Sequence, residues 1–196
     1  MIDDYVSYTR REIAINNYRP DVVVNMDETN VDFDMVSTTT LDERGARSVS
    51  VKSTGSTQRC TVILAVTASG VKLPPLCIFK GVDNDRSRIR AEFTNPRLEY
   101  PQDLVYAVQE KAWNDASTMR KWIELVWRRF CEERGLPTYL ILDEFSVHMM
   151  SETMRKIQSC GTQVDNIPAG YTGAVQVLDK GVNEPFKDKL HLKYLQ

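Results

Sequence analysis

The fold of this chain is decided by a short apolar segment, residues 21–27, with the sequence DVVVNMD. Its three consecutive valines are β-branched, which favours an extended strand, and an uninterrupted apolar run is typical of a strand buried on both faces. A second segment of the same kind covers residues 139–143, YLILD. Both segments finish on an aspartate, so we expect Asp27 and Asp143 to lie at the ends of two buried strands.

Further extended segments lie between these two strands. Residues 48–52, SVSVK, alternate polar and apolar side chains, which predicts a half-buried strand. Residues 60–67 and 76–80 are apolar runs that are each closed by a glycine-containing turn. Together with residues 21–27 they predict four strands joined by short turns, as in an antiparallel meander. Residues 82–104 are charged and irregular, and we expect them to form an exposed insert.

The rest of the chain predicts alternating strands and helices. Large apolar side chains recur every three or four residues over 119–130, between capping residues and Gly135, which predicts an amphipathic helix. The other predicted elements are a strand over 105–108, a helix over 151–159 with Ser151 as its cap, an edge strand over 162–168 and a last helix from Asp179 onwards. This order predicts an α/β fold in which a mixed sheet carries helices on both faces.

The composition excludes several classes of protein. The chain has 196 residues, of which 42% are hydrophobic and 27% charged, enough for one domain with a substantial core. No run of 18 apolar residues and no secretion signal is found, so we expect no membrane span. Four cysteines without a Cys-x-x-Cys pair and two histidines do not have the spacing of a structural zinc site, and we expect reduced thiols.

The net charge of −2 restricts how the chain engages nucleic acid. A domain that binds DNA by itself is usually basic. The charge therefore favours one of two interpretations. Either the chain does not bind nucleic acid, or it is a catalytic core whose main DNA-binding module lies elsewhere.

Three aspartates, Asp27, Asp143 and Asp179, stand at strand ends or at the start of a predicted helix. For each one alone, capping of a turn or helix remains an alternative role. All three together favour a shared site, because ligand sites in open α/β sheets gather beyond the ends of the strands. Converging carboxylates suit Mg²⁺, and two such ions about 3.5–4 Å apart promote phosphodiester cleavage. Without metal the carboxylates repel one another.

The motifs around these aspartates resemble those of the pogo/Tigger branch of the Tc1/mariner transposases, which are DDE superfamily endonucleases. Residues 25–29, NMDET, resemble the first-aspartate motif of this family. Residues 140–143, LILD, followed by His148, resemble the second motif. Residues 168–179, PAGYTGAVQVLD, resemble the third. The likeness covers roughly residues 20–190, which is nearly the whole chain.

The resemblance implies a ribonuclease H-like fold and a catalytic triad, Asp27, Asp143 and Asp179, that binds two Mg²⁺ or Mn²⁺ ions. It implies cleavage and joining of DNA strands at transposon ends, with water as the first nucleophile and a DNA 3′-hydroxyl as the second. Double-stranded DNA, as transposon ends and target, is then the expected partner. A nuclear location is also expected, and the resemblance allows a homodimer.

The resemblance also sets the expected domain organisation. Residues 1–20 are polar and helix-like, and we interpret them as an N-terminal helical remnant. Residues 21–196 are expected to form the ribonuclease H-like DDE endonuclease catalytic domain. Family members carry one or two helix-turn-helix modules before this domain, and residues 1–20 are too short for one. A separate DNA-reading module is therefore expected but absent from this chain.

Several residues near the motifs leave alternatives open. Three of them depart from the family pattern: Glu144, Val177 and Glu184.

An alternative function is a domesticated, non-catalytic relative that serves as a DNA-binding or chromosome-associated protein, although the three intact aspartates argue against it. Strand alternation points Glu28 away from Asp27, which favours a structural or solvent-facing role. His148 either takes part in the site or makes one hydrogen bond in a loop.

Aromatic and basic side chains offer weaker signals. Trp122 and Trp127 lie on the apolar face of the predicted helix, which favours core packing over stacking with unpaired bases. Among the lysines, Lys180 has the best position for a phosphate contact because it follows Asp179 directly.

Overall fold

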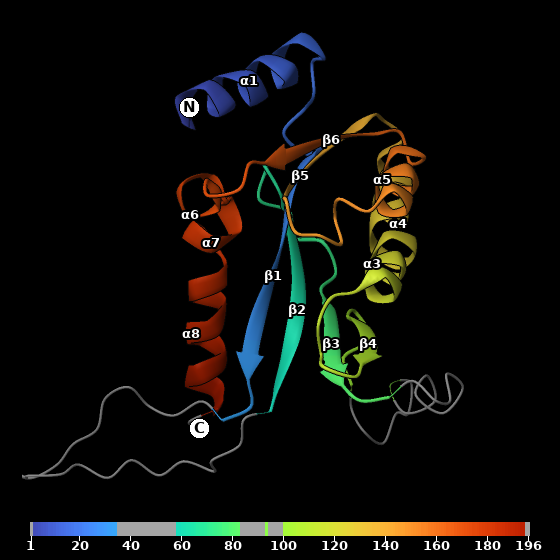
Figure 1. Ribbon diagram of the computed structural model, residues 1–196, viewed down its shortest axis with the longest axis vertical. Helices are drawn as coiled ribbons and strands as arrows, with labels where there is room; N and C mark the ends of the chain where they lie inside the picture. Colours follow the sequence, from blue (N-terminus) through green and yellow to red (C-terminus); the bar gives the residue numbers. More distant parts are fainter. Residues whose placement is uncertain (1, 35–57, 83–92, 94–99, 195–196) are drawn as a thin grey trace, which may run out of the picture.

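The computed structural model describes residues 2–34, 58–82, 93 and 100–194, and a six-stranded mixed sheet forms its centre (Figure 1). The strands are β1 (Val23–Asp32), β2 (Arg59–Thr67), β3 (Leu76–Lys80), β4 (Val105–Gln109), β5 (Thr138–Asp143) and β6 (Thr162–Ile167). Their order in the sheet is β4-β3-β2-β1-β5-β6. The pairs β1/β2 and β2/β3 are antiparallel, whereas β1/β5, β5/β6 and β3/β4 are parallel. The predicted mixed sheet, which begins with antiparallel strands, is confirmed.

Helices cover both faces of this sheet, as predicted. The helical elements are α1 (Ile2–Ile15), α3 (Ala116–Trp122), the π-helical turn η2 (Ile123–Trp127), α4 (Arg128–Arg134), α5 (Ser151–Gln158), α6 (Thr172–Val175), α7 (Val177–Gly181) and α8 (Asn183–Tyr194). Figure 1 shows α3, α4 and α5 on one side of the sheet and α6, α7 and α8 on the other. The sheet is therefore the middle layer of three.

The two faces of the sheet carry separate hydrophobic clusters. Val24 and Met26 of β1 pack toward α3–α5, in the larger cluster. Val31, on the same strand, packs instead with Leu178 of α7. Because successive side chains of a strand point to opposite faces, odd-numbered residues of β1 face α7 and α8. Asp27 is one of these odd-numbered residues, so its position within β1 determines which helices it meets.

The long helical segment from residue 116 to 134 forms as the sequence predicts. Asp115 is its N-cap and accepts hydrogen bonds from the backbone of Ser117 and Thr118, in a capping box. Gly135 ends it in the left-handed conformation, with φ of 61°. Trp122 and Trp127 are fully buried and stacked, with ring centroids 5.7 Å apart, so their predicted core role is confirmed.

Two local predictions are wrong. Strand β1 does not end at Asp27 but continues to Asp32, because its antiparallel pairing with β2 runs on to Arg59. Asp27 therefore lies in the middle of a strand. The N-cap of α5 is Met150 rather than Ser151, and no side chain caps this helix end. The predicted strand over 48–52 and most of the predicted insert over 82–104 lie outside the described residues.

Helix α1 docks on the edge strand β6 through polar side chains. Thr9 donates a hydrogen bond of 2.6 Å to the buried carboxylate of Asp165, which also accepts one of 2.8 Å from Tyr139. Gln163 donates to Glu12 at 3.1 Å. The helix predicted within residues 1–20 is thus confirmed, while the domain boundary at residue 20 stays a prediction. Across the described ranges, we find no helix with the length and apolar character needed to span a membrane.

Candidate metal site

Two of the three predicted aspartates face each other between β1 and α7. Asp27 is 7% exposed and belongs to the face of β1 that α7 covers. Asp179 lies on α7, and Asn183, the first residue of α8, connects the two carboxylates. The Nδ2 amide of Asn183 donates hydrogen bonds of 3.0 Å to Asp27 Oδ2 and to Asp179 Oδ1. The fold therefore brings these two acids to one place although 152 positions separate them in the sequence.

A buried pair of amide side chains holds α7 against the sheet. Asn25 donates to Gln176 Oε1 at 2.7 Å, and its own Oδ1 accepts the backbone N–H of Leu178 at 3.2 Å. Gln176, which is fully buried, donates to the backbone carbonyl of Met26 at 3.2 Å. Because buried amides without partners are costly, this exchange fixes the register of α7 on β1. Asn25 and Gln176 thereby position Asp179 beside Asp27.

The proximity of the carboxylates changes the acidity of Asp27. Burial, followed by the negative charges of Asp179 and Glu28, raises the pKa of Asp27 to about 7, and the hydrogen bond from Asn183 acts in the opposite direction. Two neighbouring carboxylates, one of them buried in the sheet, are the kind of oxygen donors that hard divalent cations bind. The residues present therefore fit a Mg²⁺ or Mn²⁺ ion, which would remove this repulsion.

Stability without metal should depend on the titration of Asp27. Since the folded pKa of Asp27 lies above its unfolded value, the folded state binds more protons between about pH 4 and 7, and stability falls as the pH rises through this range. We expect Asp27→Asn to match the wild type near pH 5 and to exceed its unfolding free energy at pH 8 by on the order of 2–4 kcal/mol. Urea denaturation in EDTA measures both values, with Asp188→Asn on the exposed side of α8 as the matched control.

If Asp27→Asn were no more stable than the wild type at pH 8, the inferred destabilisation of the ionised Asp27 by burial and by the neighbouring carboxylates would be wrong.

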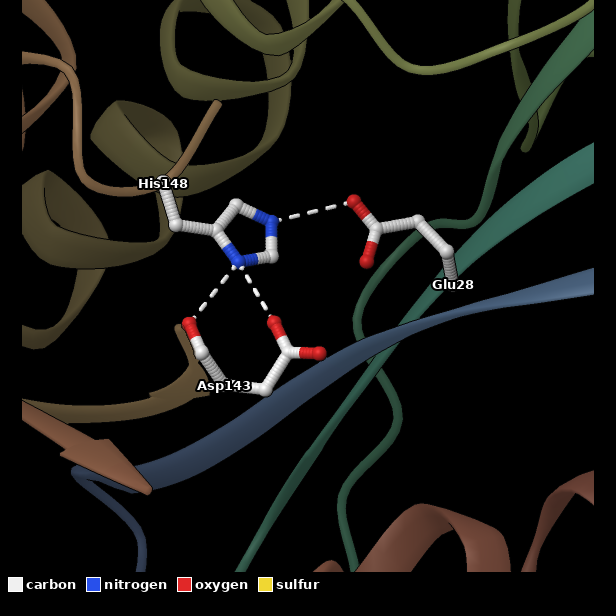
Figure 2. A group of neighbouring side chains, drawn as sticks. All are labelled: Glu28, Asp143 and His148. Atoms are coloured by element: carbon white, nitrogen blue, oxygen red, sulfur yellow. Dashed lines mark hydrogen bonds and ion pairs between the residues drawn. The ribbon is translucent and has the colours of Figure 1, made fainter. Parts of the chain in front are cut away.

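Asp143 ends β5, next to β1, and its side chain turns toward His148. The parallel register pairs Asn25 with Ile141, so Asp27 and Asp143 each lie two residues further along neighbouring strands. Figure 2 shows Asp143 beneath the ring of His148, with one carboxylate oxygen directed away from it. Oδ1 of Asp143 accepts from His148 Nδ1 at 2.9 Å and from the Phe145 backbone at 3.2 Å. Oδ2 has no hydrogen bond to the described residues.

His148 bridges two carboxylates in a buried position. Its Nε2 donates to Glu28 Oε1 at 3.0 Å, on the side of the ring opposite Asp143 (Figure 2). Burial alone lowers the pKa of the fully buried His148, but Asp143 and Glu28 outweigh it and raise that pKa to about 10. Burial likewise raises the pKa of Asp143, and the hydrogen bond and charge of His148 outweigh it, so that pKa lies below its ordinary value. His148 is therefore an imidazolium at neutral pH.

Ligand atoms of Glu28, Asp143 and His148 lie within 4.8 Å of one another, which is a spacing that a metal ion could span. Both ring nitrogens of His148 already donate hydrogen bonds, however, and a protonated imidazole has no lone pair for a metal. We interpret this trio as an ion triad that orients Asp143. Asp143 then offers its other oxygen, Oδ2, on the side away from the ring.

The structure adds residues whose role the sequence reasoning missed. Asn25 lies two positions before Asp27 on a strand, and Asn183 lies four positions after Asp179 in a helical segment, so each shares a face with its aspartate. This spacing is the feature of the sequence that could have identified both residues as neighbours of the aspartates. Glu28 points away from Asp27 as predicted, but it contacts His148 and Asn114 rather than solvent.

The structure also places the other residues that the sequence singled out. His148 makes more than the single hydrogen bond that one alternative proposed, because it contacts two carboxylates. Glu144 accepts a hydrogen bond of 3.0 Å from the backbone of Ala169, and so links the loop after β5 to the loop after β6. Lys180 is exposed next to Asp179. The catalytic and metal-binding roles of Asp27, Asp143 and Asp179 stay predictions.

Comparison with known proteins adds a family and a fold. The family model described as DDE superfamily endonuclease matches residues 57–196. The Homo sapiens protein “Pogo transposable element with KRAB domain” is 29% identical over 202 residues, covering 99% of this chain and 31% of that protein. The Homo sapiens protein “Pogo transposable element with ZNF domain” is 22% identical over 190 residues, covering 97% of this chain and 13% of that protein. The chain thus spans less than a third of the length of these relatives.

A solved structure supports the same fold. The “Mos1 transposase paired-end complex with left transposon end” is similar with a TM-score of 0.64 and 9% sequence identity, covering 96% of this chain and 47% of that chain. At this identity the likeness concerns the fold alone. It confirms the predicted ribonuclease H-like sheet with helices on both faces.

Proposed function

Since the chain belongs to the DDE superfamily of endonucleases, in the pogo and Tc1/mariner group of transposases, we propose that it is a metal-dependent catalytic domain that cleaves and joins DNA strands at transposon ends. The observation that carries the proposal is the pairing of the buried Asp27 with the exposed Asp179 through Asn183, with Asp143 at the end of the neighbouring strand. An ionised Asp27 facing Asp179 has little structural use, because burial and the neighbouring negative charge both disfavour its charged form.

Each part of the site has a task in this reaction. Asp27, Asp143 and Asp179 would hold two Mg²⁺ or Mn²⁺ ions. Such a pair of ions supplies activation of the attacking hydroxyl and stabilisation of the leaving oxygen. Asn25 and Gln176 hold Asp179 against β1, and His148 orients the carboxylate of Asp143.

The partners follow from the same proposal. Double-stranded DNA, as transposon ends and target, is the substrate, and Lys180 is placed to contact a phosphate beside Asp179. The net charge of −2 supports a separate basic module, of the helix-turn-helix kind, as the main source of DNA affinity. A nuclear location and a homodimer belong to the proposal as well.

The departures from the family pattern at Glu144, Val177 and Glu184 favour a second candidate function, a domesticated relative that acts as a DNA-binding or chromosome-associated scaffold without catalysis. Such a scaffold has no need for divalent metal at Asp27 and Asp179. Metal binding therefore separates the two functions, and this chain can be tested for it directly.

We expect Mn²⁺ to stabilise the chain. A ligand at ten times its Kd adds about 1.4 kcal/mol to the unfolding free energy, which for a chain of this size raises Tm by about 3–6 °C. Differential scanning calorimetry with increasing MnCl₂ measures the shift. Asp179→Asn should remove most of it, whereas Glu184→Gln, an exposed neighbour on α8, should keep it. An unchanged wild-type Tm at millimolar Mn²⁺ would favour the scaffold.

The reaction itself is tested with the complete protein and a duplex that carries the terminal repeat of its element. Strand cleavage should require Mg²⁺ or Mn²⁺ and should stop in EDTA. Cleavage that proceeds at the same rate in EDTA would contradict the proposed chemistry.

A further inference from the structure

Asn183 occupies the place between Asp27 and Asp179 where a cation would be expected. Its Nδ2 group carries two hydrogens, and each is used in a hydrogen bond of 3.0 Å to one of the two carboxylates. The residue is 6% exposed, so water screens these contacts weakly. The amide thus presents two partial positive charges to the acidic pair.

The other half of the same amide is unsatisfied. Asn183 Oδ1 is buried and has no hydrogen-bond partner within the described part of the chain. Most buried polar atoms are paired, and an exception calls for a specific cause, such as a bound ion or water. Beside two carboxylates, the missing partner of a carbonyl oxygen is a group of positive charge.

We propose that Asn183 is a fourth residue of the metal site, which bridges Asp27 and Asp179 through Nδ2 without metal and gives Oδ1 to a divalent cation held by the same two aspartates. The nitrogen and oxygen of a side-chain amide have nearly the same shape. A half-turn about the Cβ–Cγ bond therefore exchanges them without displacing the helix. Amide oxygens are established ligands of hard divalent cations.

The exchange gives Asn183 two opposing effects on metal affinity. The cation must displace two hydrogen bonds from the carboxylates, which weakens binding, and it gains an oxygen ligand, which strengthens it. The first effect alone would make Asn183 a competitor of the metal. Under the proposal, ligation outweighs competition, so removing the amide should raise the Kd for the metal. If competition outweighed ligation, removing the amide would lower that Kd.

The test measures Mn²⁺ affinity of the isolated 196-residue chain by electron paramagnetic resonance of free Mn²⁺. Asn183→Leu removes the amide at similar size and is expected to raise Kd for Mn²⁺ by about 10- to 100-fold. Glu184→Gln, the next residue of α8, is the matched control and should leave Kd unchanged. An unchanged or lower Kd in Asn183→Leu would overturn the proposal.

A second measurement on the wild type covers the case in which Asn183→Leu does not fold. In a ¹H–¹⁵N correlation spectrum, the side-chain amide protons of Asn183 should shift upfield as Mg²⁺ is added, because they leave their carboxylate acceptors. Amide protons that keep their positions at saturating Mg²⁺ would overturn the proposal.

This inference rests on the proposed function, because both require metal at Asp27 and Asp179, but the two fail differently. If the wild type binds no Mn²⁺ at millimolar concentration, the proposed function fails and the role of Asn183 fails with it. If the wild type binds Mn²⁺ and Asn183→Leu binds it equally well or better, only the role of Asn183 fails.

Discussion

Replacing Asp143 by Asn in the complete protein is expected to slow metal-dependent cleavage of a transposon-end duplex by about 10³-fold, which corresponds to about 4 kcal/mol of transition-state stabilisation. The substitution keeps the shape of the side chain, so an oxygen can still accept from His148 Nδ1. It removes the negative charge, and a neutral amide holds a divalent cation and the charge of the reacting phosphate less well.

The measurement is single-turnover cleavage of a labelled duplex in Mg²⁺ and in Mn²⁺. Asp188→Asn is the matched control, since it makes the same chemical change on the exposed surface of α8 and should keep the wild-type rate. Thermal denaturation of Asp143→Asn shows whether the variant is folded. Wild-type cleavage by a folded Asp143→Asn protein would eliminate Asp143 from the catalytic set.

The second large effect concerns His148. Removing one member of a buried ion pair leaves its partners charged and unpaired, which typically costs about 3–5 kcal/mol. His148→Ala exposes both Asp143 and Glu28 to this penalty, because the ring contacts both carboxylates. We expect the unfolding free energy to fall by this amount at pH 7. His191→Ala, which changes the other histidine of the chain, should have a much smaller effect.

The same variant should show a distinct pH dependence. The pKa of His148 is raised from its ordinary value to about 10 in the folded state. Its stabilising effect is therefore complete below about pH 6.5 and is lost as the pH rises toward 10. The difference in unfolding free energy between wild type and His148→Ala should shrink over this range, measured by urea denaturation at pH 6, 8 and 10. A constant difference would show that His148 is neutral and acts by packing alone.

Local sequence patterns determined much of the sheet and the main helix. β-Branched and apolar runs located β2, β3 and β5 to within two residues. Such runs indicate that a strand is buried, and they do so whichever helices or strands cover it. The capping residue Asp115 and the terminating Gly135 determined the long helix in the same way, since both act on their own backbone. The extension of β1 beyond Asp27 depended instead on its pairing with β2. The sequence of residues 21–27 does not indicate how far that pairing continues.

The sequence by itself determined the family and predicted the three aspartates as a site, because the motifs around each aspartate are short stretches of the chain. Only the tertiary structure decided which side chains surround them. Asn183 reaches Asp27 across 156 positions, and His148 reaches Glu28 across 120. Such contacts depend on how α7, α8 and the loop after β5 pack onto opposite faces of one sheet. The alternation of side chains along a strand determines which face of the sheet a residue occupies. The packing of helices from distant parts of the chain determines which side chains it contacts there.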